Sequence, residues 1–431
     1  MRSRTALHAA TLLALSVPPL MLVSAQGPTR ILYLLALVGL LYAWWQARES
    51  HEGYRARRTV PHDFWLLTLA FMAPLLAMLV SSAALGQWRS SHAEKLLRFV
   101  LALPLAWMLL RVSRTSLQRI QWSLMAGAMA GALLLYLALA NPDLGRGAVV
   151  AYGARNNAVH VANVVLLLGL ATGLLLPWTL SAWPRAEAAL KLVVVALAAV
   201  SVWLSHTRSS WTLLAIYVLV LLRTRIRWAP RRKLLCAIVL IVVLLGALFV
   251  LLYTEAGRFG ELATDLQRYG RGDRDSSTGI RLQLWHAAWT MFIDQPWTGV
   301  GASGFRDALE ALQLRGIVTQ RVAAEFGEPH NDFLGALALY GAPGLASMLA
   351  LYLIPAALFF RRAASPDTVI RVAASIGLLY TLGYALFSTT EMMFRTMRSV
   401  PGYAVTVVLL YALANTRPDA LQGSGSTKPD R

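Results

Sequence analysis

The sequence predicts an all-α polytopic membrane protein of about twelve transmembrane helices, and three observations support this fold class. Of the 431 residues, 57% are hydrophobic and 14% are charged, whereas a soluble domain averages roughly 25% charged residues. The mean hydropathy is +0.55. The apolar residues also occur in runs of about 20, which as helices cross a hydrocarbon core of ~30 Å. Lipid is therefore the expected solvent for most of the chain.

The predicted spans alternate with short connections, apart from one long connection between the ninth and the tenth. The spans are 5–25, 30–46, 62–84, 97–112, 119–141, 157–182, 187–205, 210–223, 234–254, 333–360, 368–390 and 396–415. They divide the chain into a first set of spans (1–254), a large loop with short amphipathic helices (255–332), a second set of spans (333–415) and a flexible tail (416–431). A loop of this length is usually functional, so we expect a site in 255–332 and in the short loops that it covers.

The basic residues indicate how the chain is oriented in a bilayer. The net charge of +19 would favour a nucleic-acid partner in a soluble protein, but no basic domain with interleaved aromatic residues is present in the sequence. Basic residues gather instead in the short connections of one side, most densely in 223–233. Because such loops remain in the cytoplasm, both termini are predicted to be cytoplasmic and the loop 255–332 to lie on the opposite side.

Two local features have ordinary interpretations. Arg2 and Arg4, the apolar stretch after them and the small residues of Val23-Ser24-Ala25 resemble a signal peptide. The apolar stretch is longer than in most signal peptides, which favours an uncleaved membrane anchor. The single cysteine, Cys236, lies in an apolar run and is expected to pack there, without a disulfide or a thiolate metal cluster.

An amphipathic helix is predicted inside the long loop, with Thr278 as its N-cap. Its apolar face is expected to contain Leu282, Trp285, Ala288, Trp289 and Phe292. Arg281 then lies in the first turn, where a guanidinium beside unpaired N–H donors suits phosphate oxygens. The spacing alone fits a solvated arginine equally well.

His330 occupies the junction between the long loop and the tenth predicted span. Pro329 disfavours helix at Glu328, while Asn331 or Asp332 can cap the span. An imidazole at this depth suits proton transfer near neutral pH, with Glu325, Glu328 or Asp332 to orient the ring. A lone histidine is more often structural, so position alone leaves both interpretations open.

Further cations are expected on the same side of the membrane. Arg208 lies in a very short turn between two apolar spans, and an ionisable group at membrane depth is a functional hypothesis by default. Arg89 and Arg155 are candidates to join an anion site. The glycine-rich run 299–304 predicts a tight turn rather than a nucleotide loop, because no βαβ unit accompanies it. The acidic residues of the long loop are scattered, so no metal site is predicted.

The motif around His330 resembles that of a known family. His330-Asn331, nine further residues and Gly341-Ala342-Pro343-Gly344 resemble the pattern His-Asn/Ser/Gln, nine residues, Gly-x-x-Gly/Thr/Tyr of the O-antigen ligase family. The family's segment before the histidine is similar to Arg281, Trp285, Pro296, Gly299-Val300-Gly301 and Phe305 here, and Arg208 resembles its other functional arginine. The long loop after the ninth span also fits this family.

The resemblance implies a glycosyltransferase of the bacterial inner membrane with a GT-C-like fold. It would transfer a polysaccharide from undecaprenyl diphosphate to a sugar hydroxyl of lipid A–core on the periplasmic face, in lipopolysaccharide assembly. The implied reaction inverts the anomeric centre without a metal or another cofactor. His330 would remove the acceptor proton, and Arg208 and Arg281 would hold the diphosphate. We expect Arg89, Arg155, Asn331 and Glu328 to assist in substrate binding.

Three other functions share part of this pattern. An O-antigen polymerase uses the same donor with a second lipid-linked glycan as acceptor, and a protein O-oligosaccharyltransferase modifies Ser or Thr. Many protein O-oligosaccharyltransferases have an additional C-terminal region, whereas the sequence here ends soon after the last predicted span. This difference favours the ligase. A transporter of anionic lipid or solute is disfavoured because the sequence predicts neither clearly broken helices nor paired repeat halves.

Overall fold

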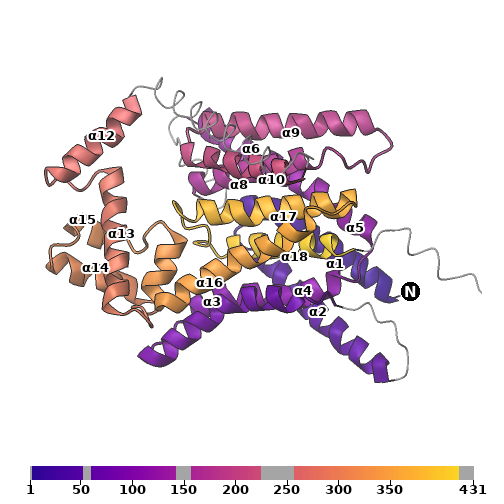
Figure 1. The fold of residues 1–431 in the computed structure, drawn as a ribbon, viewed down its shortest axis with the longest axis horizontal. Coiled ribbons are helices and arrows are strands. Elements are labelled where there is room, and N and C mark those ends of the chain that lie inside the picture. The colour runs from indigo at the N-terminus through magenta and orange to yellow at the C-terminus, as the bar shows by residue number, and fades with distance from the viewer. Residues whose placement is uncertain (1, 52–59, 142–156, 225–256, 417–431) are drawn as a thin grey trace, which may run out of the picture.

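The computed structural model describes residues 2–51, 60–141, 157–224 and 257–416, and every regular element in these ranges is a helix (Figure 1). The helices before residue 225 are α1 (Arg2–Val23), α2 (Gly27–His51), α3 (Phe64–Leu85), α4 (Ser90–Leu109), α5 (Arg114–Gln118), α6 (Ile120–Ala140), α8 (Ala158–Leu174), α9 (Pro184–Leu204), the 3-10 helix η1 (Arg208–Thr212) and α10 (Leu213–Thr224). Those after residue 256 are α12 (Gly257–Gly270), α13 (Ser277–Asp294), α14 (Gly304–Leu314), α15 (Gln320–Glu325), α16 (Asp332–Arg362), α17 (Thr368–Phe387) and α18 (Ser399–Ala414).

The length and composition of these helices support a multi-pass membrane protein. Six stretches are long and apolar enough to cross a membrane: Gly27–Arg48, Phe64–Leu85, Arg114–Ala140, Pro184–Leu204, Asp332–Arg362 and Thr368–Phe387. Four shorter apolar helices, within α1, α8, η1–α10 and α18, coincide with further predicted spans, as does α4. The predicted span 234–254 and the predicted tail lie outside the described residues, so the total of twelve stays a prediction.

The connections between helices gather at two opposite ends of the bundle. At one end, the Asp367 end, Asp367 accepts two hydrogen bonds from Arg114, at 2.6 and 2.8 Å, and Arg362 pairs with Asp63 at 2.8 Å. At the other, the Glu391 end, the Met397 carbonyl accepts a hydrogen bond from Arg98. The connections predicted to share a side of the membrane therefore lie together in the structure.

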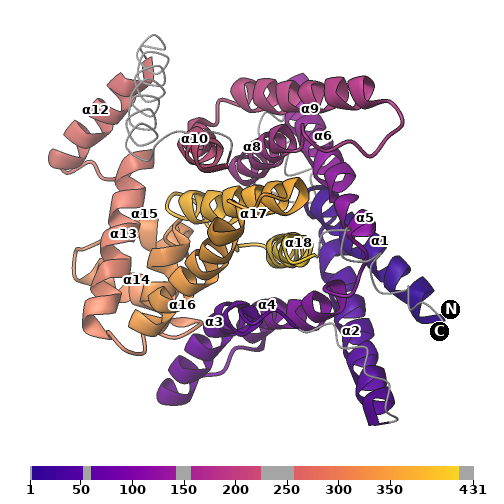
Figure 2. The ribbon, with the colours of Figure 1, turned by 45° about the vertical axis from the view of Figure 1, so that its right-hand side comes forward.

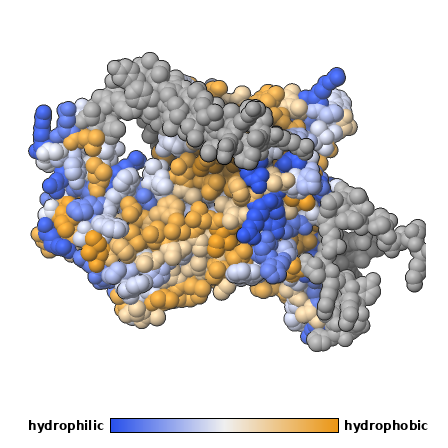
Figure 3. Space-filling model, in the orientation of Figure 1, coloured by the Kyte–Doolittle hydropathy of each residue, from blue (hydrophilic) through white to orange (hydrophobic). Residues whose placement is uncertain are grey.

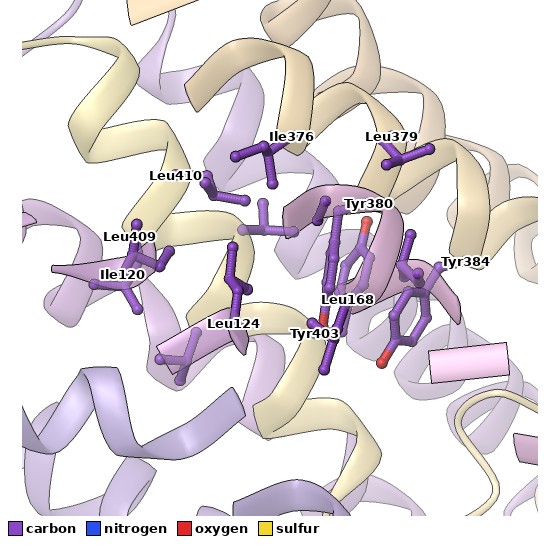
Figure 4. Packing of buried hydrophobic residues seen from close by; sticks show 14 of the residues in the cluster. Ile120, Leu124, Leu168, Ile376, Leu379, Tyr380, Tyr384, Tyr403, Leu409 and Leu410 are labelled. Atoms are coloured by element: carbon purple, nitrogen blue, oxygen red, sulfur yellow. The ribbon is translucent and has the colours of Figure 1, made fainter. Parts of the chain in front are cut away.

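The centre of the bundle is α18, and all of its residues are buried. Figure 2 views this helix nearly end-on, with α1, α4, α16 and α17 around it. Tyr380, Tyr384 and Tyr403 pack where α17 meets α18, beside Leu168 of α8 (Figure 4). Phe394 of the α17–α18 connection is the fourth ring of this cluster, 5.9 Å from Tyr384 and 5.4 Å from Tyr403 between ring centroids. These rings hold the α17–α18 connection firmly at the Glu391 end.

The outer surface has the pattern of a membrane protein. Large apolar side chains of α2, α3 and α9 are exposed, among them Leu40, Val80 and Val193. Figure 3 shows apolar residues across the middle of the visible face and hydrophilic residues towards both sides. Water would be a poor solvent for a band of this kind, whereas lipid tails solvate it.

A second, smaller core lies beyond the membrane helices. Residues of α13, α14 and α15, including Leu284, Leu309 and Val322, pack together and against Ala338 of α16. These helices lie to one side of the bundle in Figure 1, beside the end of α3. The described part of the predicted loop 255–332 contains the helices α12 to α15 with short connections between them.

Helix α16 is broken at Gly341, whose φ and ψ of 65° and −156° are accessible to glycine and strained for other residues. The break leaves carbonyls without helical partners, and the segment 296–301 satisfies them. The amides of Val300 and Gly301 donate to Ala338 and Leu339 at 2.9 and 3.0 Å, and the amide of Ala342 donates to Pro296 at 2.8 Å. The expectation that no helix is broken is therefore wrong, because sequence periodicity does not reveal where another segment replaces the helical bonds.

The substitution Gly341→Ala is expected to destabilise the protein. A Cβ at this position would lie 2.5 Å from the Pro296 carbonyl oxygen, and the backbone strain alone costs about 1–3 kcal/mol. Thermal unfolding of the purified protein in detergent should show a clearly lower midpoint. Gly270→Ala is the matched control, because a Cβ there meets open space; equal midpoints for the two variants would contradict the role of Gly341.

Candidate active site

His330 adopts a backbone conformation that few residues other than glycine accept. It lies between α15 and α16 with φ = 51°. A positive φ at a histidine costs free energy and persists only where the surroundings impose it. Strained residues of this kind cluster at functional sites, which makes the junction the first place to look for chemistry.

Two neighbouring segments impose this conformation. Trp285 of α13 donates its indole N–H to the Pro329 carbonyl at 3.1 Å. Asn331 accepts a hydrogen bond from the Leu334 amide at 3.0 Å and donates to the Thr389 carbonyl at 2.9 Å. Asn331, one of the two caps that the sequence allowed, is thus the N-cap of α16, and His330 is held between α13 and the α17–α18 connection.

The carboxylate beside His330 is Glu391. Its Oε1 lies 3.5 Å from the imidazole Nδ1, and the Glu391 side chain is 4% exposed. This distance is within the range of an ion pair with an imidazolium, but it is longer than that of a strong hydrogen bond. Glu391 also accepts a hydrogen bond from Asn157 of the α8 N-terminus at 3.3 Å. An imidazole that gains a proton here would be stabilised by this carboxylate.

The surroundings of Glu391 keep it ionised. Burial by itself raises the pKa of this carboxyl, but its contact with His330 and its bond to the Met392 amide outweigh burial, so the pKa lies below its ordinary value. A depressed pKa means that the stabilising interactions are complete at neutral pH and are lost as the pH falls through the acidic range. The negative charge is therefore present wherever a histidine base would work.

The three carboxylates that the sequence offered for His330 have other partners. Glu325 pairs with Arg321 at 3.3 Å, and Glu328 pairs with Arg395 at 3.0 Å. Asp332 accepts hydrogen bonds from the Ser388 hydroxyl and the Met393 amide. Glu391 escaped prediction because it is distant in sequence; its only signal is an acidic residue just past the eleventh predicted span, on the side of the long loop.

The imidazole keeps one nitrogen for a ligand. The His330 side chain is 21% exposed, and Phe326 lies edge-on to the ring at 6.1 Å between centroids. No protein hydrogen bond to Nε2 occurs within the described ranges. A partly exposed imidazole with one nitrogen facing a buried carboxylate is able to accept a proton from a bound hydroxyl.

Arg281 lies on the side of α13 that faces His330. It precedes Trp285 by one helical turn, so the two share a helix face, and Trp285 contacts Pro329. Its side chain is exposed and has no ion-pair partner among the residues described. The predicted N-cap Thr278 is wrong: Ser276 accepts the capping bond from the Gly279 amide at 3.2 Å. The helix begins earlier than predicted, so Arg281 lies in its second turn, away from the free amides of the first turn. Any contact of Arg281 with an anion would therefore depend on the charge of its guanidinium alone.

The buried face of α13 also differs from the predicted one. The buried residues are Gly279, Ile280, Gln283, Leu284, Ala287, Ala288 and Met291. Trp289, predicted to be on the apolar face, is 48% exposed. Gln283 is buried because it bonds the Arg274 carbonyl and the Thr319 amide, at 2.8 and 2.7 Å. Hydropathy cannot anticipate such a polar contact, so the predicted face is rotated from the real one.

The backbone of Arg208 lies at the same end of the bundle. Arg208 begins η1, which contacts α8 and α17; the position of its side chain is outside what the structure describes. Two residues later, Ser210 donates to Asn163 at 2.7 Å, and Asn163 contacts the sulfur of Met393. Arg208 therefore belongs to a segment that is tied to the connection carrying Glu391.

The remaining predicted residues are less closely placed. Arg89 is exposed in the connection between α3 and α4. Near this connection, Ser81 of α3 donates to the Thr298 carbonyl at 2.6 Å, which joins α3 to the segment 296–301. Among the described residues no hydrogen bond or ion pair joins Arg89 to His330, and Arg155 lies outside them. The described ranges contain no cluster of three or more His, Cys, Asp or Glu side chains that could hold a metal ion.

Together these features describe the class of protein: a multi-pass membrane protein with an imidazole–carboxylate pair and arginines at one end of its helices. The family model described as O-antigen ligase matches residues 193–349. The O-antigen ligase of Escherichia coli K12 is 25% identical over 227 residues, covering 51% of this chain and 50% of that protein. An uncharacterised protein of Haemophilus influenzae is 21% identical over 201 residues, covering 46% of this chain and 50% of its own length.

The predicted resemblance to the O-antigen ligase family is therefore confirmed. The matched segment contains Arg208, Arg281 and His330, and the chain spans about half the length of the curated relatives it matches. Members of this family are glycosyltransferase-like enzymes of O-antigen processing that act on lipid-linked glycans.

Glu391→Gln is expected to lower the rate of any reaction in which His330 acts as a base by about tenfold or more, because it removes the charge that stabilises an imidazolium while keeping the shape of the side chain. Glu391→Asp should retain more activity than Glu391→Gln. Glycan transfer by purified variants measures the effect. Glu325→Gln removes an acidic side chain that does not face His330 and should leave turnover unchanged; equal losses in the two Gln variants would contradict the pairing.

Proposed function

We propose that the protein is an O-antigen ligase, which transfers a polysaccharide from undecaprenyl diphosphate to a sugar hydroxyl of lipid A–core in lipopolysaccharide assembly. The observation that supports this most directly is the strained His330 beside the buried Glu391, at the junction of the extramembrane helices with α16. A base at this level is within reach of a sugar whose lipid carrier remains in the bilayer. Holding the donor at one depth also supplies proximity.

The proposed setting follows the charge pattern. The bacterial inner membrane would contain twelve spans in a GT-C-like arrangement, within residues 1–254 and 333–415, with the loop 255–332 in the periplasm. Both termini, and the tail 416–431, would be cytoplasmic. The grouping of connections at two ends supports the alternation that this topology requires.

In the proposed reaction, His330 removes the proton from the acceptor hydroxyl as its oxygen attacks the anomeric carbon. The new glycosidic bond forms on the face opposite the leaving group, so the anomeric centre is inverted. The bond from the anomeric carbon to the diphosphate oxygen breaks, and its electron pair leaves with undecaprenyl diphosphate. Glu391 stabilises the resulting imidazolium. The diphosphate bond is already activated, so the scheme requires no other energy source.

The arginines neutralise the leaving group in this scheme. Arg208 and Arg281 would contact the diphosphate and stabilise the charge that grows on it in the transition state. Arg89 and Arg155 would extend the cationic surface, and Asn331 would act by fixing the backbone of His330, as its two hydrogen bonds indicate. Glu328 would act through Arg395, with which it pairs.

Two related enzymes and one non-enzyme remain as alternatives. An O-antigen polymerase or a protein O-oligosaccharyltransferase would use the same donor chemistry with a different acceptor. The break in α16 is a feature that transporters also use. Here the freed carbonyls of Ala338 and Leu339 are bonded by the segment 296–301, so they do not line an open path. The ligase therefore stays the preferred function.

His330→Ala is expected to abolish transfer while the protein still folds, because no other base occupies the position. Purified protein would be supplied with labelled lipid-linked glycan and, in turn, with lipid A–core, a second lipid-linked glycan and a pilin-like peptide. The wild type should label lipid A–core. His286→Ala, on the exposed side of α13, is the control and should be fully active. Normal transfer by His330→Ala would exclude the base role, and labelling of another acceptor would select one of the alternatives.

Arg281→Ala should cost more than about 1 kcal/mol of transition-state stabilisation, roughly a fivefold loss in kcat/KM. Arg281→Lys should recover part of this, because an ammonium supplies charge without the fork geometry of a guanidinium. Arg321→Ala removes an exposed, paired arginine of α15 and should have little effect. Addition of EDTA should leave the wild-type rate unchanged; a rate that disappears with EDTA and returns with magnesium would refute charge neutralisation by arginines alone.

A further inference from the structure

Arg398 is a buried cation that the proposed mechanism does not use. It directly precedes α18 in the α17–α18 connection, the same connection that carries Glu391. The residue is 3% exposed. Its Nε and one terminal nitrogen, Nη1, are buried without a hydrogen-bond partner in the described part of the chain. Both nitrogens carry N–H donors, so at least two buried donors have no partner among the described residues.

Arg98 shows how the fold treats another arginine at the same end. It is also 3% exposed, but its guanidinium donates to the Glu94 carboxylate at 2.7 Å, to the Met397 carbonyl at 2.7 Å and to the Tyr33 hydroxyl at 3.2 Å. A buried guanidinium with such partners is satisfied. The contrast is informative because the partner of Arg98, Met397, is the residue next to Arg398.

A buried guanidinium without a counter-ion is costly. Desolvation of an unpaired charge is unfavourable by several kcal/mol even after relaxation, so such groups normally find an anion. The polar groups around Arg398 are neutral ones: Ser399 bonds the Thr396 hydroxyl at 2.6 Å and lies 3.5 Å from His160 Nε2. Glu391 is engaged by His330 and Asn157. The described surroundings therefore lack the anion that Arg398 requires.

The position of Arg398 connects it with the candidate active site. His160 of α8 is close enough to both Glu391 and Arg398 to interact with their charges, so both charges lie near the same imidazole. Arg398 is also the N-cap residue of α18 and makes no side-chain capping bond. In the first turn of this helix Ser399 donates its amide to the Thr396 carbonyl, Gly402 donates to the Arg398 carbonyl and Pro401 has no N–H. The Val400 amide is therefore the donor that this turn can offer beside the guanidinium. A buried guanidinium with free N–H donors favours an oxyanion, and a phosphate oxygen matches its geometry.

We propose that Arg398, at the start of α18, forms an anion site for a phosphate or diphosphate group, and that its ligand in the cell is the diphosphate of the lipid-linked donor. The identity of this ligand rests on the proposed function, whereas the anion site itself rests on the geometry. Arg398 would be the innermost cation of the site and would hold the diphosphate in the bilayer boundary. Its Nε and Nη1 would then donate to phosphate oxygens.

The experiment measures binding and stability separately. Purified protein in phosphatidylcholine nanodiscs is titrated with farnesyl diphosphate, farnesol, inorganic diphosphate and phosphatidylglycerol. The wild type should bind farnesyl diphosphate, and Arg398→Met should weaken that binding at least tenfold. Arg398→Met should leave the melting temperature without ligand unchanged or raise it, because an apolar side chain relieves an unpaired buried charge. Arg398→Lys should bind with intermediate affinity.

Arg98→Met is the matched control, since it removes an equally buried but satisfied arginine. It should lower the melting temperature and retain the affinity for farnesyl diphosphate. The inference is overturned if Arg398→Met binds farnesyl diphosphate like the wild type, or if farnesol binds as tightly as farnesyl diphosphate. Binding of phosphatidylglycerol with equal affinity would overturn the donor as the ligand and assign the site to a membrane phospholipid.

The outcomes separate this inference from the proposed function. A wild type that binds farnesyl diphosphate through Arg398 but transfers no glycan to lipid A–core would retain the anion site and refute the ligase. A wild type that transfers glycan while Arg398→Met keeps wild-type affinity and kcat/KM would retain the ligase and refute the anion site.

Discussion

The geometry of the site depends on one buried carboxylate, that of Asp332. Its Oδ2 accepts hydrogen bonds from the Ser388 hydroxyl at 2.8 Å and from the Met393 amide at 2.7 Å, while the Asp332 amide donates to the Ser388 carbonyl at 2.9 Å. These bonds join the start of α16 to the α17–α18 connection. Because His330 lies two residues before Asp332 and Glu391 lies inside the connection, the same bonds bring imidazole and carboxylate together. Asp332, which the sequence offered as a carboxylate partner of His330, instead positions both His330 and Glu391.

The spacing of the family motif has a structural explanation in α16. The nine residues between Asn331 and Gly341 form the first part of the helix, about two and a half turns. The motif therefore joins the strained His330 at one end to the break at Gly341 at the other. The segment 296–301 bonds to the break, and Trp285 bonds next to the histidine. The extramembrane helices are thus attached to α16 at both ends of the motif, which fixes how Arg281 approaches the site.

Charge at this end of the bundle is unevenly compensated. Three acidic groups are paired with cationic side chains: Glu328 with Arg395, Glu391 with His330, and Glu94 with Arg98. Arg398 is buried without a described partner, and Arg281 is exposed without one. An excess of unpaired guanidinium groups beside an imidazole favours a substrate that carries several negative charges and a hydroxyl that loses a proton. A lipid diphosphate with a sugar acceptor has this combination.

The sequence by itself determined the membrane class, the positions of the apolar helices, a cap at Asn331 or Asp332 and the placement of His330 where loop meets span. These follow from local rules: hydropathy, charge bias, proline and cap preferences. Only the tertiary structure decided that Glu391 faces His330, that α16 breaks at Gly341, that Gln283 turns inward and that Arg398 is buried unpaired. Each of these depends on contacts between segments that are distant along the chain. The periodicity of one helix contains no information about which distant segment will form a hydrogen bond with it.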